Sequence, residues 1–109
     1  MPKLFDILKD TGIPFAMYRW ESKPSAPYGL LSIERGSDVV ASDVMIVAQA
    51  INGSIDLFVS DPATSWPQRI QDAINGRVAW TLNSVQYEED TRLIHYEWLY
   101  EAVSLSAIN

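Results

Sequence analysis

The sequence predicts a single α+β domain: a mixed, mostly antiparallel sheet with two helices packed on one face and a long protruding β-hairpin. Three observations predict this class. The chain has 109 residues, which suits one domain. Two amphipathic helical stretches alternate with strand-like stretches. The strand-like stretches between Tyr28 and Asp61 are also longer than ordinary strands, which have about six residues. The predicted order over residues 1–109 is α-β-β-β-α-β-β, without an internal repeat or linker.

The first elements are short. Residues 3–11 predict a helix, because their apolar side chains recur at spacings of three and four. Gly12 suits the left-handed position that ends a helix, and Pro14 prevents its continuation. Residues 15–20 predict a short strand, and the two prolines of residues 21–27 indicate a stiff loop.

The centre of the chain predicts a long hairpin. An apolar run from Tyr28 reaches a turn at Gly36-Ser37-Asp38, and a strand of about sixteen residues follows from Val44 to Val59. In the second part of this strand apolar and polar residues alternate, which predicts one buried face and one solvent-exposed face. Residues 44–50 are nearly all apolar and need to be covered on both faces. Gly53 indicates a bulge or a close backbone approach. Because an overhanging strand exposes unpaired N–H and C=O groups, this hairpin predicts assembly with another chain.

The second helix has two possible starts, at Asp61-Pro62 and at Ser65-Trp66-Pro67, and Asn75-Gly76 predicts its end. Two strands follow, over residues 78–87 and 92–103, joined by a polar turn. The last strand has the cleanest alternation in the chain. Its predicted core face carries Ile94, Tyr96, Trp98 and Tyr100.

Composition and charge limit the classes of partner that we expect for this chain. The formal net charge is −6 and the eight basic residues form no run, so the chain is poorly equipped to bind duplex DNA. The same charge would suit a passage through which DNA slides without sticking. No apolar run approaches the ~20 residues that span a bilayer, so no membrane partner is expected. The absence of cysteine and of an apolar signal centre favours an intracellular origin.

No constellation of residues predicts catalysis, a cofactor or a metal. His95 is the only histidine and lies mid-strand near Glu97 and Glu101. A solvated residue that pairs across strands is therefore a simpler interpretation of His95 than a catalytic base. The acids of residues 88–90 indicate a solvated turn. Asp38 and Asp43 do not match the spacing of a calcium loop and favour a turn. We therefore expect no catalytic, cofactor-binding or metal-binding residue and no enzymatic activity.

Aromatic and apolar residues at unexpected places indicate a contact surface instead. Trp20 lies next to a loop, and Phe58 lies on the otherwise wet side of its strand. Two valines directly follow the predicted turn, where solvent is expected. The predicted subunit interface comprises Trp20, Val39, Val40, Val44, Ile46 and Phe58.

The order of these pieces resembles the tail-completion (tail-terminator, head–tail joining) proteins of long-tailed bacteriophages and prophages. The likeness covers nearly the whole chain, though each piece alone is unspecific. The helix around Trp66-Pro67 is shorter and less charged than in the family's pattern. The pieces are, in order, Leu8-Lys9-Asp10-Thr11-Gly12-Ile13-Pro14, Tyr18, the Lys23-Pro24 to Pro27-Tyr28 loop, Gly36-Ser37-Asp38, Ala41-Ser42-Asp43, Ile55-Asp56-Leu57-Phe58, Asp61-Pro62 and Ile94-His95-Tyr96-Glu97-Trp98.

The resemblance implies a non-enzymatic virion structural protein, assembled in the cytoplasm of a bacterial host and located at the head–tail junction. It implies a homohexameric ring that caps the tail tube and joins it to the head connector, with DNA passing through without specific binding. The hairpin around residues 36–50 would then supply contacts between subunits. Two other classes stay open: a small peptide- or ligand-binding module that uses an exposed sheet edge and an aromatic face, and a hydrolase-like enzyme.

Overall fold

The computed structural model describes residues 2–36, 40–42, 45–48 and 50–109 and confirms the predicted α+β class. A five-stranded sheet has the strand order β1-β2-β5-β7-β6, and a separate two-stranded sheet pairs β3 with β4. Strand β1 runs parallel to β2, and the other neighbours are antiparallel. The elements are α1 (Leu4–Lys9), β1 (Phe15–Met17), β2 (Tyr28–Gly36), β3 (Val40–Ser42), β4 (Met45–Ala48), β5 (Ile51–Val59), α2 (Trp66–Ile74), β6 (Ala79–Glu88), β7 (Leu93–Ala102) and the 3-10 helix η1 (Leu105–Ala107).

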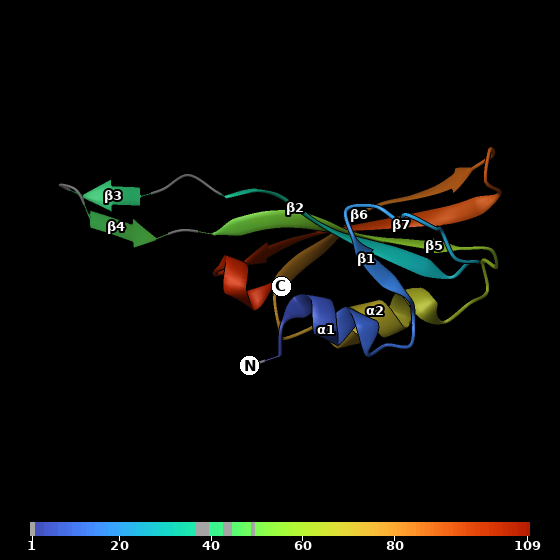
Figure 1. The fold of residues 1–109 in the computed structure, drawn as a ribbon, viewed down its shortest axis with the longest axis horizontal. Coiled ribbons are helices and arrows are strands. Elements are labelled where there is room, and N and C mark those ends of the chain that lie inside the picture. Colours follow the sequence, from blue (N-terminus) through green and yellow to red (C-terminus); the bar gives the residue numbers. More distant parts are fainter. Residues whose placement is uncertain (1, 37–39, 43–44, 49) are drawn as a thin grey trace.

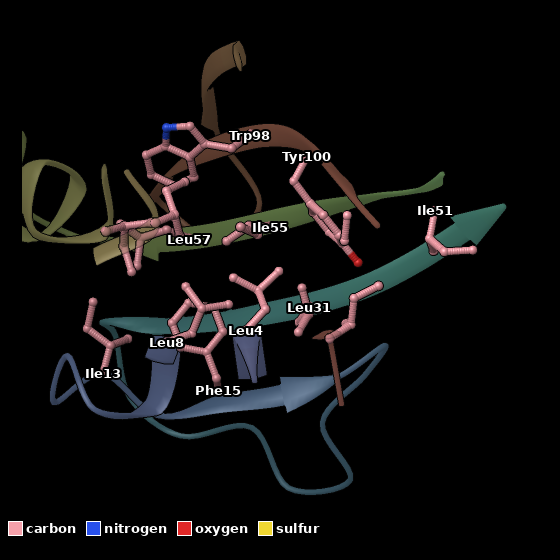
Figure 2. Packing of buried hydrophobic residues seen from close by; sticks show 14 of the residues in the cluster. Leu4, Leu8, Ile13, Phe15, Leu31, Ile51, Ile55, Leu57, Trp98 and Tyr100 are labelled. Carbon is pink, nitrogen blue, oxygen red and sulfur yellow. The ribbon is translucent and has the colours of Figure 1, made fainter. Parts of the chain in front are cut away.

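Helices α1 and α2 lie on the same face of the five-stranded sheet, and within the described residues no helix covers the opposite face (Figure 1). The apolar stripes of the helices meet the inward-facing side chains of the central strands. Figure 2 shows Leu4 and Leu8 of α1 pointing toward Leu31 and Ile55 of the sheet, all of them at most 1% exposed. Burial of this kind is the main favourable term in folding a domain of this size.

Helix α2 is held in place by polar contacts as well as by its buried Ile70 and Ile74. The indole N–H of Trp98 on β7 donates to Gln71 Oε1 over 3.1 Å, which ties α2 to the middle of the sheet. The guanidinium of Arg69 donates to the carbonyl oxygen of Thr11 over 3.3 Å, which ties α2 to the end of α1.

The helix ends follow the predicted signals. Gly12 and Gly76 both adopt positive φ angles, 93° and 78°, just beyond the two helices, as expected for residues that close a helix in the left-handed region. The second of the two possible starts is the one used, since α2 begins at Trp66. Asp61 instead accepts a hydrogen bond from the backbone N–H of Ala63 over 2.9 Å and so forms a turn before the helix.

Gly53 marks a close backbone approach, as predicted. A β-carbon there would collide with the carbonyl oxygen of Ser32 on β2 and with the ring of Tyr100 on β7. The bulge itself lies on the partner strand, because the β2–β5 register shifts between Ile33 and Arg35 opposite Gly53 and Asn52.

The hairpin differs from its prediction in how its strands are divided. Instead of one strand from Val44 to Val59, the structure has β4 and β5, and β4 ends at Ala48. Residues 40–42, expected in a turn between two aspartates, form strand β3. Strand β2 extends through Gly36, and the rest of the predicted turn at 36–38 lies outside the described residues. The strand predicted over 15–20 is also shorter, since β1 ends at Met17.

Candidate assembly surface

The hairpin continues past the body of the domain as a narrow projection. We use the name arm for strands β3 and β4, residues 40–42 and 45–48. The arm extends from one end of the molecule (Figure 1), and the described chain measures 52 × 28 × 26 Å along its principal axes. Within the described chain, β3 and β4 pair only with each other. A two-stranded hairpin is at best marginally stable in water by itself, so the arm gains stability if a further surface covers it.

Apolar residues dominate the described part of the arm. Its seven described residues are Val, Ala and Ser in β3 and Met, Ile, Val and Ala in β4, without a charge among them. The arm contains two of the residues that the sequence assigned to an interface. Val40 lies in β3, in register with Ala48, and Ile46 lies in β4, in register with Ala41. Two more of them, Val39 and Val44, lie outside the described residues.

The remaining two predicted interface residues, Trp20 and Phe58, flank Tyr28 on the body of the domain. The edge of Trp20 meets the Tyr28 ring at a centroid distance of 6.5 Å. Its indole N–H donates to the carbonyl oxygen of Gly29 over 3.2 Å. In this chain Trp20 therefore fastens the loop after β1 to strand β2.

Phe58 belongs to a ladder of rings across three strands. It lies between Tyr28 of β2, at 4.9 Å, and His95 of β7, at 4.3 Å, with interplanar angles of 18° and 23°. The three side chains lie on the face opposite the helices, because Phe58 is in register with both neighbours and alternates with the buried Leu57 and Val59. We call this side of the sheet the open face. Stacked rings stabilise adjacent strands beyond their buried area.

The sole histidine sits between two carboxylates on the open face. His95 Nε2 lies 2.6 Å from Asp56 Oδ1 of β5, and His95 Nδ1 lies 3.2 Å from Glu88 Oε2 at the end of β6. The sequence had suggested Glu97 and Glu101 as neighbours, but Glu97 accepts a 2.7 Å hydrogen bond from Asn83 instead. The hydrogen bond with Asp56 and the two nearby negative charges raise the pKa of His95, although partial burial opposes the shift.

This arrangement favours a structural clamp over catalysis. When it carries both protons, the imidazole donates from both ring nitrogens, and His95 then joins β5, β6 and β7 through charge-assisted hydrogen bonds. With a carboxylate at each nitrogen, the ring has no free nitrogen with which to take a proton from a hydroxyl nucleophile. Ser54, the nearby hydroxyl, donates to Asp56 Oδ2 over 3.3 Å rather than to the imidazole. Sequence spacing could not reveal this cluster, because its members come from three strands.

Two hollows lie near the base of the arm. One, of about 470 Å³, is bordered by Trp80, Tyr100 and Glu101, and another, of about 670 Å³, by Ile7, Ala50 and Val103, among others. His95 lines neither of them. Among residues 2–36, 40–42, 45–48 and 50–109, no group of three or more acidic or histidine side chains is placed to hold a metal ion. In the same part of the chain, no helix is long and apolar enough to cross a bilayer.

Strand β6 is an exposed edge that the sequence analysis did not single out. Its residues Leu82, Val85 and Tyr87 are in register with Trp98, Tyr96 and Ile94, so they face the helix side of the sheet. They lie beyond the cover of the helices and remain 41%, 50% and 61% exposed. We call these three residues the edge strip. A strand was predicted over residues 78–87, but its place at the edge of the sheet, which decides its exposure, depends on strand order, a long-range property.

Neither the family models nor the curated proteins compared with this sequence match it. The arm, the open face and the edge strip are therefore the structural features of this chain that bear on its function.

Proposed function

We propose that this protein is a non-enzymatic, ring-forming tail-completion protein of a long-tailed bacteriophage or prophage, located in the virion at the head–tail junction. The observation that supports the proposal most is the arm, an apolar hairpin that projects from the body and pairs only with itself in the described chain. In a ring-forming protein, such an arm would bind a second copy of the chain. The resemblance in the order of motifs supplies the phage context.

The mechanism is geometric. An arm at one end of each subunit grips a different surface on the next subunit, and such head-to-tail contacts close into a ring when the rotation between copies permits it. In a homohexamer, one side of the ring would cap the tail tube and the other would meet the head connector protein. The chain supplies shape and contact energy, and no bond is made or broken.

The charge of the body suits a channel for DNA. The open face carries Asp56, Glu88, Glu97 and Glu101. Its basic groups include His95, between two of these carboxylates, and Lys23, beside the ring of Tyr28. With a net charge of −6, the ring would repel the phosphate backbone, so DNA would pass through without specific binding.

Light scattering coupled to size-exclusion chromatography tests assembly. We expect a hexamer, or a monomer that forms rings when purified tail tubes are added. The variant Ile46→Lys/Val47→Lys places two charges on β4 of the arm, which should prevent assembly while leaving the circular dichroism of the body unchanged. The matched control Val103→Lys/Leu105→Lys changes two exposed apolar residues beyond the end of β7 and outside the arm itself, 83% and 59% exposed, and should assemble normally.

Phage extracts test the tail-joining role directly. An induced lysate from which this gene has been removed should contain separate heads and uncapped tails in electron micrographs. Adding the purified protein should restore joined particles, and adding the arm variant should not. Restoration by the arm variant to the level of the unchanged protein, or no restoration by either, would refute the proposal.

A second candidate function is a small module that binds an extended peptide. The observation in its favour is the edge of β6, whose strip of exposed apolar side chains resembles the edge used in β-strand addition. A protein that stays monomeric with and without tail tubes, and that binds extended peptides with loss of affinity in Val85→Lys/Tyr87→Lys, would favour this function over ring assembly.

A further inference from the structure

The outer edge of β6 has the features of an acceptor for another strand. Within the described chain, β6 pairs with β7 on one side and with no strand on the other. Natural sheet edges are commonly protected by lysines, prolines or inward-facing charges. Residues 79–87 contain none of these. The strand does have a register shift between Leu82 and Ser84, and bulges also protect edges, but residues 84–88 continue in register with β7 beyond it.

The arm and the β6 edge are alike in their lack of charged residues. The described residues of β3 and β4 are uncharged, as are residues 79–87 of β6. Elsewhere the chain is strongly acidic, and its open face is rich in carboxylates, so two copies that met through those surfaces would repel each other. The arm and the β6 edge are two neutral, apolar surfaces on which one copy can meet another without that penalty.

We infer that strand β6 of one copy is the receptor for the arm of a second copy, which extends the five-stranded sheet of the body by adding its own strands. The unpaired backbone of β6 would supply the hydrogen bonds of the new strand pair. The edge strip, formed by Leu82, Val85 and Tyr87, would supply the apolar contact area. This inference rests on the proposed function, since it names the surface that the arm of the ring subunit grips.

Pairing β6 with the arm of a second copy leaves fewer surfaces uncovered in the assembly than pairing it with a second β6. A symmetric β6–β6 contact would cover both edges but leave both arms paired only with themselves. An arm–edge contact covers one arm and one edge at once. It also joins two different surfaces, as ring closure requires, whereas a symmetric contact stops at a dimer.

Disulfide trapping can distinguish the possible contacts, because the chain contains no cysteine. Met45→Cys, Ile46→Cys and Val47→Cys are made singly on the arm, and Val85→Cys is made on the edge. Each arm variant is mixed with a differently tagged edge variant and oxidised mildly, so that even a weak contact is captured when the α-carbons approach within about 7 Å. Val103→Cys, an exposed apolar position beyond the end of β7 and not on β6, serves as the control partner.

We expect at least one arm variant to give a disulfide-linked heterodimer with Val85→Cys in clear excess over both homodimers and over the Val103→Cys control. A predominant homodimer of Val85→Cys would indicate symmetric edge pairing and overturn the inference. A predominant homodimer of an arm variant would indicate arm–arm contact and overturn it as well. Products no more abundant than with the control for all three arm variants would also overturn it.

Charge substitution gives an independent test through mixing. The edge variant Val85→Lys/Tyr87→Lys and the arm variant Ile46→Lys/Val47→Lys should each weaken self-association by on the order of tenfold or more. Mixed together, they should form a one-to-one heterodimer that grows no further, because one partner keeps an intact arm and the other an intact edge. Sedimentation velocity with two dyes detects this species, and its absence in a mixture of folded variants contradicts the inference.

The two proposals fail in different ways. If the arm variant loses tail joining but the edge variant joins tails normally, the ring function stands and the β6 receptor is refuted. If the arm variant joins tails normally, the proposed function itself falls, whatever disulfides are formed.

Discussion

The ring of Tyr100 lies across the backbone of Gly53, and its hydroxyl donates to the carbonyl oxygen of Ser32 over 2.9 Å. One side chain of β7 thereby crosses β5 and is fastened to β2, at the level where the bulge of β2 begins and the hairpin leaves the body. Only glycine leaves room for this crossing. The contact anchors the base of the arm to the domain.

Substitution of Gly53 by alanine should therefore destabilise the domain strongly. The added methyl group would collide with the backbone oxygen of Ser32, which cannot move without disturbing the β2–β5 pairing. We expect a loss of about 3 kcal/mol in the free energy of unfolding, measured by urea denaturation. Gly76→Ala is a useful comparison, because a β-carbon there meets no atom within 4 Å and carries only the cost of its positive φ. Equal effects of the two substitutions would contradict the crowding argument.

Removal of the Tyr100 hydroxyl tests the anchor more gently. Tyr100→Phe keeps the ring over Gly53 but leaves the carbonyl oxygen of Ser32 without this partner. We expect a loss of about 1 kcal/mol in unfolding free energy. Burial raises the pKa of the Tyr100 phenol, so the group should stay protonated in alkaline buffers that ionise exposed tyrosines. An ultraviolet titration in which every tyrosine ionised near pH ~10 would contradict this assignment.

The clamp around His95 should make stability depend on pH in a defined direction. The pKa of His95 is raised above 6.5 in the folded chain, so the folded state holds the proton more tightly than the unfolded state. The stabilisation is fully present below the unfolded pKa and is lost as the pH rises through the folded pKa. His95→Gln should therefore cost about 1–3 kcal/mol near pH ~6 and clearly less near pH ~9.

Denaturation curves of the unchanged chain and of His95→Gln at the two pH values provide that measurement. Asn83→Ala makes a matched control, because it removes a hydrogen bond to a carboxylate on the same face without removing a titrating group. Its cost should be similar at both pH values. If the cost of His95→Gln increased with rising pH, the folded state would hold the proton of His95 less tightly than the unfolded state, contrary to the raised pKa.

The acidic open face predicts that duplex DNA does not bind. Fluorescence anisotropy with a labelled duplex should show no binding at physiological salt, and lowering the salt should not reveal a steep increase in affinity. The variant Glu97→Lys/Glu101→Lys reverses two charges on that face and should introduce weak, salt-sensitive binding. Salt-dependent binding by the unchanged protein would argue against a passive channel.

Local signals in the sequence predicted much of the fold. The left-handed glycines at 12 and 76 end the two helices where their patterns end, because a residue without a β-carbon relieves the strain of positive φ. The alternation from Ile94 to Tyr100 identified the face of β7 that is buried, with Trp98 fully inside. These features depend on the chemistry of neighbouring residues, which is why the sequence alone predicts them.

The candidate surfaces were predictable only in part. The apolar residues of the hairpin indicated an assembly element, and two of them, Val40 and Ile46, lie in strands β3 and β4 of the arm. Their part in an interface stays a prediction. The exposed β6 edge and the carboxylates around His95 were missed, since both arise from strands that are distant in the sequence. Periodicity assigns a residue to a face of its strand but says nothing of which strand lies alongside.

By itself, the sequence determined the class of the domain, the approximate order of its elements, the faces of its last strand and the presence of an overlong hairpin. The tertiary structure decided that the hairpin divides into a body and a separate arm, that Tyr100 crosses Gly53 to reach β2, and that β6 lies at the edge. The physical reason is the range of the interactions. Helix ends and alternation are fixed within a few residues, whereas strand order and exposure follow from packing among segments up to tens of residues apart.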